Sequence, residues 1–192
     1  MKNKNSNFNN FVAPILAIVV ICLVVTFLLA LTYGVTKPII DRNTAKAANE
    51  ARTKILPDAH GDFKEYKGKL VVPEKNKVYA EDCYIANNGS GMVVTAKSNS
   101  YGGLLTAMIG IDKDGAITKV VVTDAADTPG VGTRAQADSH LDQYKGLSKL
   151  GNINIKQDTT VKYISGASIS SEAIHKAVNC ALKQYEKVGG AK

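Results

Sequence analysis

The sequence predicts an α+β protein with a single N-terminal transmembrane helix and a domain of twisted antiparallel sheet with flanking helices. Residues 11–36 carry no charge, whereas the rest of the 192-residue chain is polar. Residues 63–122 are rich in β-branched side chains interrupted by turn sequences, and from residue 170 onward apolar residues recur at helical steps. The length leaves room for about one domain beside the helix, which we place at residues 59–192.

The uncharged segment, residues 11–36, is long enough to cross a membrane. As a helix it would extend roughly 39 Å, and a hydrocarbon core is about 30 Å thick. A cleavable secretory signal is the alternative, because Lys2 and Lys4 precede the apolar run. We favour an uncleaved anchor with a short tail at residues 1–10. The run exceeds the roughly 7–15 apolar residues of a signal, and no convincing A-x-A-like cleavage site follows it.

The charges around this helix leave open which side of the membrane the domain occupies. Five basic residues follow the span, against two before it: Lys37, Arg42, Lys46, Arg52 and Lys54. Taken alone, this count favours a cytoplasmic domain, although a folded domain can translocate largely regardless of its charge. The cysteines do not settle the compartment, because Cys83 and Cys180 could form a disulfide or be two separate core residues.

The spacing of apolar residues predicts a juxtamembrane helix over residues 37–58. This helix continues from the span or kinks at Pro38, and Pro57 stops it. Four runs rich in β-branched residues come next, KVYAEDCYIA, GMVVTAKS, LLTAMIGID and ITKVVVTD, separated by NNGSG, SYGG and DKDG. These runs predict a meander of antiparallel strands joined by tight turns. Asp114-Gly115 is the strongest hairpin signal.

Two more helices are expected after the sheet. Residues 124–150 begin as a Gly/Pro loop and then carry apolar residues at spacings that suit a short helix: Leu141, Tyr144, Leu147 and Leu150. From Ser170 onward the apolar positions form one stripe of an amphipathic helix: Ala173, Ile174, Ala177, Val178, Ala181, Leu182 and Tyr185.

Composition and motifs argue against several functions. The net charge of +7 comes from scattered lysines without a dense basic run, which indicates a solvated surface, or one that lies against anionic lipid, rather than a nucleic-acid site. His60, His140 and His175 are isolated, so we expect surface or capping histidines and no metal site. There is no G-x-S-x-G motif, and no acid and base pair stands out, so no catalytic residues are assigned.

Three segments could carry chemistry. Residues 163–174, YISGASISSEAI, open the last helix, where serine hydroxyls commonly accept the free N–H groups of the first turn. The same N–H groups and the positive end of the helix dipole would equally suit a phosphate. Residues 127–133, DTPGVGT, and residues 100–103, SYGG, are either plain surface turns or backbone that approaches a flat ring closely, with an aromatic residue beside it.

Five segments, taken in order, resemble the G subunit of the Rnf electron-transport complex. They are YGVTKPI, KILPDA, the run from YIANNGSG to KVVV, DTPGVG and SGASISSEAI. Each motif alone is weak, but their order and spacing are specific, and the resemblance covers nearly the whole chain. The chain is similar, more distantly, to the C subunit of the sodium-translocating NADH:quinone reductase, which has the same FMN-binding domain.

The resemblance implies FMN bound covalently through its phosphate. In this family the phosphate is esterified to the hydroxyl in the fourth position of a Ser/Thr-Gly-Ala-Thr motif. Ser165, Gly166 and Ala167 match this motif, and Ser168 stands at the acceptor position. The family's flavin loop and its Gly-Tyr-Gly-Gly turn imply further cofactor-binding residues: Thr128, Pro129, Gly130, Val131, Gly132, Tyr101, Gly102 and Gly103.

Several positions depart from the family pattern. Ser168 replaces the usual threonine, which keeps the hydroxyl but loses the methyl group that restricts χ1. Ser100 replaces the first glycine of the turn. Lys162 stands where the family commonly has an aspartate, six residues before the acceptor. If the flavin-transferring enzyme recognises that acid, attachment would be slow, absent, or dependent on a differently adapted transferase. Alternatively, Lys162 holds the phosphate by its charge.

The implied protein is a single-pass protein of the cytoplasmic membrane, with residues 1–10 inside and the flavin domain on the periplasmic or extracellular side, against the lysine count. It would relay electrons in an ion-translocating ferredoxin:NAD oxidoreductase complex. Its implied partners are the other integral and peripheral subunits and a flavin transferase; we expect contact with the membrane and none with nucleic acid. Two alternatives are a non-flavinylated assembly or binding subunit, and a free-standing extracellular flavin electron carrier.

Overall fold

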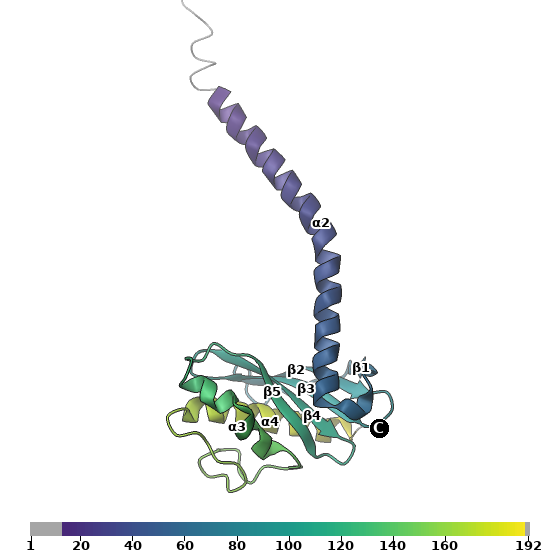
Figure 1. Ribbon diagram of the computed structural model, residues 1–192, viewed down its shortest axis with the longest axis vertical. Coiled ribbons are helices and arrows are strands. Elements are labelled where there is room, and N and C mark those ends of the chain that lie inside the picture. Colours follow the sequence, from purple (N-terminus) through teal and green to yellow (C-terminus); the bar gives the residue numbers. More distant parts are fainter. Residues whose placement is uncertain (1–12, 191–192) are drawn as a thin grey trace, which may run out of the picture. The chain divides into compact units, whose positions relative to one another are not determined.

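The structure is a computed structural model that describes residues 13–190. The predicted tail, residues 1–10, lies outside the described residues, as do the first two residues of the predicted span. The chain divides into two compact units, residues 1–47 and 48–192. The first unit contains most of one long helix, and the second contains a sheet with its covering helices (Figure 1).

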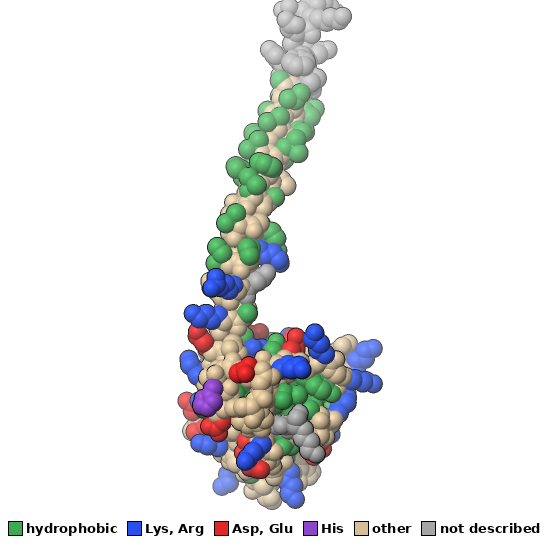
Figure 2. Space-filling view, turned by 90° about the vertical axis from the view of Figure 1, so that its right-hand side faces the viewer, with side chains coloured by type: hydrophobic (Ala, Val, Ile, Leu, Met, Phe, Trp, Pro, Cys, Tyr) green, Lys and Arg blue, Asp and Glu red, His purple; other side chains and the backbone are tan. Residues whose placement is uncertain are grey.

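The long helix, α2, runs without a break from Ala13 to Ile55 and passes through Pro38. Its N-terminal part exposes a sleeve of apolar side chains, which Figure 2 shows as green spheres along the helix. Within residues 13–190, α2 is the one helix that is long and apolar enough to cross a membrane. The helix ends where Pro57 disfavours a helical conformation for the residue before it, and Pro57–Ala59 forms a 3-10 turn, η2.

The expected meander is confirmed as one sheet of five antiparallel strands in the spatial order β1-β2-β3-β4-β5. Each strand pairs with its neighbour in sequence; tight turns at residues 87–90, 100–103 and 113–116 connect β2 to β5, whereas the longer segment 66–77 connects β1 to β2. The bounds are Phe63–Glu65 for β1, Val78–Ala86 for β2, Gly91–Asn99 for β3, Leu104–Asp112 for β4 and Ile117–Asp124 for β5. The Asp114-Gly115 hairpin joins β4 to β5, with Gly115 at a φ of 85° that favours glycine.

Buried side chains lie on both faces of the sheet. Alternate residues of a strand point to opposite faces, so neighbouring residues belong to different clusters. On β3, Val94 points to the main core, whereas its neighbour Val93 packs against Ile55 and Leu56 at the end of α2. The last helix, α4 (Ser168–Val188), covers the main-core face, where it contacts β2, β3 and β4. Burial of each large aliphatic side chain contributes about 1.5–3 kcal/mol to this packing.

Helix α4 ends at Val188, and Gly189 after it takes the left-handed conformation that commonly ends a helix. Its start differs from the expectation. The helix begins at Ser168 rather than near Ser170, and the residue before it, Ala167, provides no side-chain cap. The expected serine cap on the first turn is therefore absent from this helix.

The predicted helix over residues 141–150 is only partly formed. After a 3-10 turn at Gly132–Gln136 (η3), a short helix at Asp138–Leu141 (α3) continues as a 3-10 turn at Asp142–Tyr144 (η4) and stops there. Gly146 then takes a φ of 81°. The backbone of residues 146 and 147 instead exchanges two hydrogen bonds with Ile117, which binds this segment to the start of β5.

The two cysteines of the domain are separate core residues. Cys83 lies on β2 and Cys180 on α4, and both are buried with free thiols. Burial raises the pKa of Cys83 to about 12 and that of Cys180 to about 11, so both thiols are protonated at neutral pH. Neither thiol has the lowered pKa of a reactive cysteine.

Replacement of Gly110 by alanine is expected to destabilise the fold by roughly 1–3 kcal/mol. A Cβ at this position of β4 would lie 2.5 Å from Cγ2 of Ile55 and 3.0 Å from its carbonyl oxygen, where α2 meets the sheet. Thermal unfolding of the full chain in detergent measures the change. Gly34→Ala is the matched control, because an added Cβ there meets nothing within 4 Å. Equal melting temperatures for the two variants would contradict the close contact.

Candidate functional site

Three segments far apart in sequence meet around one pocket of about 320 Å³. This volume is at the lower end of the range for small-molecule sites, roughly 300–1,000 Å³. The segments are the turn after β3, the loop that precedes η3, and the first turn of α4 with the residues before it. The lining residues are Tyr101, Asp127, Thr128, Val131, Gly132, Gly166, Ala167, Ser168, Ile169 and Ser170.

The turn between β3 and β4 holds an aromatic ring at the rim of the pocket. Ser100 and Gly103 close the turn through a backbone hydrogen bond of 2.7 Å from the Ser100 N–H to the Gly103 carbonyl. Tyr101 at its tip is 74% exposed. Gly102 has no space for a side chain, because an added Cβ would collide with the carbonyl of Ala126. The turn therefore lies directly on the second segment.

The second segment is a compact loop built around Thr128. The Thr128 carbonyl accepts hydrogen bonds from the N–H groups of residues 131, 132 and 133. The hydroxyl of Thr133 accepts another from Gly130, whose φ of 75° favours glycine. These bonds present Val131 as an exposed apolar side chain beside the pocket. The loop is thus shaped by its own backbone rather than by the core.

The third segment brings the start of α4 to the pocket. Gly166, with a φ of 83°, turns the chain, and the first helical hydrogen bond runs from the Ser171 N–H to the Ala167 carbonyl. The Ser171 hydroxyl accepts a bond from the Ile164 N–H, so it braces the preceding loop. No side chain caps the helix, and its first turn contains no acidic residue. Its first N–H groups and positive dipole are available to an anion.

The sequence-based site residues divide into two groups in the structure. Seven line the pocket: Tyr101, Thr128, Val131, Gly132, Gly166, Ala167 and Ser168. Five do not line it but shape the turns that do: Gly102, Gly103, Pro129, Gly130 and Ser165. The pocket also includes three residues that lie in the candidate segments but were not named as cofactor-binding: Asp127, Ile169 and Ser170. Of these, Ile169 could have been recognised from the sequence, because a large aliphatic residue is unusual in a helix start made of small and polar residues.

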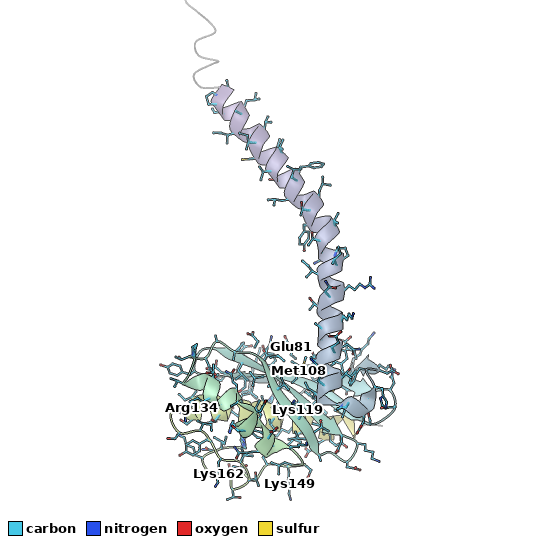
Figure 3. The ribbon with its side chains drawn as sticks, viewed as in Figure 1. Glu81, Met108, Lys119, Arg134, Lys149 and Lys162 are labelled. Atoms are coloured by element: carbon cyan, nitrogen blue, oxygen red, sulfur yellow. The ribbon has the colours of Figure 1, made fainter. Side chains whose placement is uncertain are left out.

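Basic side chains lie close to this end of the domain without lining the pocket. Figure 3 shows Arg134 and Lys162 at the end of the domain where α4 begins. Both side chains are exposed, and neither lines the pocket. The backbone of Lys162 is held by Gln143, whose side chain accepts from the Lys162 N–H at 2.9 Å.

A buried polar network supports the segment that leads into α4. His175 of α4 makes two bonds, from its Nε2 to the carbonyl of Asn152 at 2.7 Å and between its Nδ1 and the Tyr144 hydroxyl at 3.2 Å. A carbonyl can only accept, so Nε2 carries the proton and Nδ1 accepts from the tyrosine. His140 bonds Gln143 through its Nδ1 at 3.1 Å. The expectation of surface or capping histidines is therefore wrong for both, since each is at most 1% exposed.

The charges in this network favour neutral histidines and an ionised aspartate. Burial lowers the pKa of His175, and burial together with His175 lowers that of His140. For Asp158, burial opposes ionisation, but hydrogen bonds from Thr160, Asn152 and Val161 outweigh it and lower the pKa to about 2. Asp158 Oδ2 lies 3.5 Å from Nε2 of His175. Within residues 13–190, no group of three His, Cys, Asp or Glu residues could hold a metal ion.

Comparison with known proteins identifies relatives of the whole chain. The FMN-binding domain family matches residues 100–183. The G subunit of the proton-translocating ferredoxin:NAD(+) oxidoreductase complex of Clostridium ljungdahlii is 26% identical over 195 residues, 98% of this chain and 99% of that protein. The G subunit of the Na(+)-translocating ferredoxin:NAD(+) oxidoreductase complex of Acetobacterium woodii is 29% identical over 90% of each chain.

A third relative and a solved structure extend this comparison. The G subunit of the ion-translocating oxidoreductase complex of Methanosarcina acetivorans is 32% identical over 171 residues, 88% of this chain and 90% of that protein. The crystal structure of NqrC from Shewanella oneidensis is 17% identical, with a TM-score of 0.47 over 63% of this chain and 67% of that one.

The free energy of unfolding is expected to fall as the pH drops below about 6.5. An unfolded histidine takes up a proton near that pH, whereas His140 and His175 have lowered pKa values and stay neutral in the fold. Their contribution is complete above about pH 6.5 and is lost at up to about 1.4 kcal/mol per pH unit for each histidine. Denaturant unfolding between pH 8 and 5 measures this slope. His140→Gln should make it shallower, and a slope unchanged by this variant would contradict the assignment.

Proposed function

This chain belongs to the G-subunit family of ion-translocating oxidoreductase complexes, and from that premise we propose that it is a membrane-anchored subunit that relays electrons through FMN esterified to Ser168. The observation that carries the proposal is the position of Ser168, at the first residue of α4 and in the wall of the pocket. Ser168 is partly buried, at the helix start with its free N–H groups. A phosphate on this oxygen would lie where the helix favours negative charge.

The residues present fit FMN in both its parts. The uncapped first turn, which contains no acidic residue, suits the phosphate. For the flat ring, Tyr101, Val131 and Ile169 offer three exposed apolar side chains around one pocket. The small residues Gly132, Gly166 and Ala167 keep the backbone close to the space between them. The phosphate would therefore lie at the start of α4, and the ring would lie on the adjoining apolar surface of the same pocket.

FMN bound here would supply the acceptance and donation of electrons, and the chain would supply attachment, orientation and exclusion of water. Tyr101 and Val131 would keep the ring at the protein surface, where a partner subunit can approach it. Electron relay requires no catalytic acid or base on this chain. An ester bond would also prevent loss of the cofactor outside the cell.

The departures at Ser168 and Lys162 are compatible with this proposal. The serine keeps the nucleophilic oxygen that an ester requires, and as the first residue of α4 it stands where the threonine hydroxyl would stand. Lys162 is exposed and does not line the pocket, so its role as a phosphate ligand has no support from this geometry. Its exposure leaves it within reach of a flavin transferase.

The partners proposed for this chain are those of its relatives. The relatives are subunits of ferredoxin:NAD(+) oxidoreductase complexes, one proton-translocating and one Na(+)-translocating. We expect this chain to assemble with the other subunits of such a complex. Those subunits, and not this chain, would react with ferredoxin and NAD. The coupling ion differs between the relatives, so their similarity does not assign it.

The anchor is the apolar part of α2, and we place the domain on the periplasmic or extracellular side. The helix is long and apolar enough to span the membrane, and its apolar side chains are exposed from Ile15 to Val35. An exposed apolar sleeve of this length is stable only in lipid or against apolar partner helices.

Ser168→Ala is expected to abolish covalent flavin. The full chain is expressed with a flavin transferase and separated on a denaturing gel, where the wild-type band should fluoresce and the variant band should be dark. Mass spectrometry of the wild-type peptide containing Ser168 should show the added mass of FMN less water. Ser139→Ala removes an exposed hydroxyl on α3 that does not line the pocket and should keep its fluorescence. A dark wild-type band would favour the non-flavinylated assembly subunit.

Protease added to intact spheroplasts should remove the domain and leave the N-terminal end of α2 protected. The reason is the proposed orientation, with the domain outside the cytoplasmic membrane. The readout is an immunoblot against epitopes at both ends of the chain. A domain that is cleaved only after the cells are lysed would reverse the orientation and agree with the lysine count instead.

A further inference from the structure

Asp127 places a carboxylate in the wall of the pocket. The residue is only 5% exposed and lines the pocket. Its donors are the Ser100 hydroxyl, 2.8 Å from each carboxylate oxygen, and the Gly102 N–H, 3.1 Å from Oδ1. Both donors are neutral, and within residues 13–190 this carboxylate has no ion-pair partner. Its negative charge is therefore held in place but not neutralised.

The surroundings of this carboxylate are tightly packed. A Cβ added to Gly132 would lie 2.7 Å from Cβ of Asp127 and 2.9 Å from the Ser170 hydroxyl oxygen. On the other side, a Cβ added to Gly102 would lie 2.9 Å from the Asp127 nitrogen. Asp127 thus fits between the turn after β3 and the first turn of α4. Asp127 therefore has little contact with bulk solvent, and a charge acts more strongly in such a place than in solution.

Accepting the proposed flavin site, on which this inference rests, we propose that Asp127 lowers the reduction potential of the flavin held in this pocket. Reduction adds electrons to the ring, and a fixed, unneutralised negative charge in the wall opposes that addition. Ser100 contributes to the stability of the site, because its hydroxyl is bonded to both carboxylate oxygens. Asp127 tunes the flavin through its charge and needs no proton transfer.

A purely structural role is the competing explanation. Asp127 links two segments that border the pocket, so its removal would loosen them whatever its charge does. Asp127→Asn separates the two roles, because an amide has nearly the same shape and its oxygen can still accept from Ser100 or Gly102, whereas its charge is zero. Asp127→Glu keeps the charge with a longer side chain. Ser100→Ala keeps the charge and removes one of the two donors.

The experiment is a potentiometric titration of the full, flavin-loaded chain in detergent. Dithionite supplies the electrons, mediator dyes equilibrate them, solvent supplies any proton, and flavin absorbance reports the reduced fraction. Asp127→Asn should raise the potential, so that the ratio of reduced to oxidised flavin at a fixed poise increases roughly tenfold. Asp127→Glu and Ser100→Ala should stay close to the wild-type ratio while melting at lower temperature.

Each outcome decides the matter. A wild-type chain without flavin defeats the proposed function itself, whereas a flavin-loaded Asp127→Asn variant with the wild-type potential overturns only the present inference. If Asp127→Asn carries no flavin, the other two variants decide, since a potential shifted in either of them, with the carboxylate retained, would assign the effect to structure rather than charge.

Discussion

The packing of α4 against the sheet is the interaction on which the site depends. Alanines and valines at the helix–sheet contact allow the helix to lie close to β3 and β4, and Ile174 and Val178 are fully buried there. This contact determines where the helix begins as well as where it lies. Because Ser168 is the first helical residue, a core made of ordinary aliphatic side chains places a hydroxyl at the pocket.

Glycines allow the other two segments to reach the same place. Gly102 lies against the backbone of Ala126, and Gly132 lies against Asp127 and Ser170, at distances that no side chain would permit. The pocket is thus a consequence of close backbone approach between three chain segments, while the bulky residues at its rim, Tyr101 and Ile169, lie outside the crowded centre. The irregular segment that precedes α4 is secured by side chains, because His175 of α4 bonds the carbonyl of Asn152 and Gln143 accepts from the Lys162 N–H.

Much of this fold can be predicted from sequence because its signals are local. Strands β2 to β5 each correspond to one β-branched run, and Asp114-Gly115 and Pro57 mark ends by their own backbone preferences, whereas the three-residue strand β1 contains no such run. The pairing of Asp127 with Ser100 spans 27 residues, and that of Tyr144 with His175 spans 31, so neither is visible in a periodicity. The helix expected beyond Tyr144 failed for the same reason, because its backbone bonds instead to Ile117 on another strand.

The uncapped start of α4 has a thermodynamic consequence for how the protein matures. N–H groups that no side chain satisfies typically leave a helix about 1 kcal/mol less stable than a capped one. An anion held there supplies the missing acceptor, and whatever binds the folded state alone shifts the folding equilibrium toward it. With the proposed flavin esterified there, newly made chains would be the less stable population, and attachment would protect the molecule against proteases that act on its opened form.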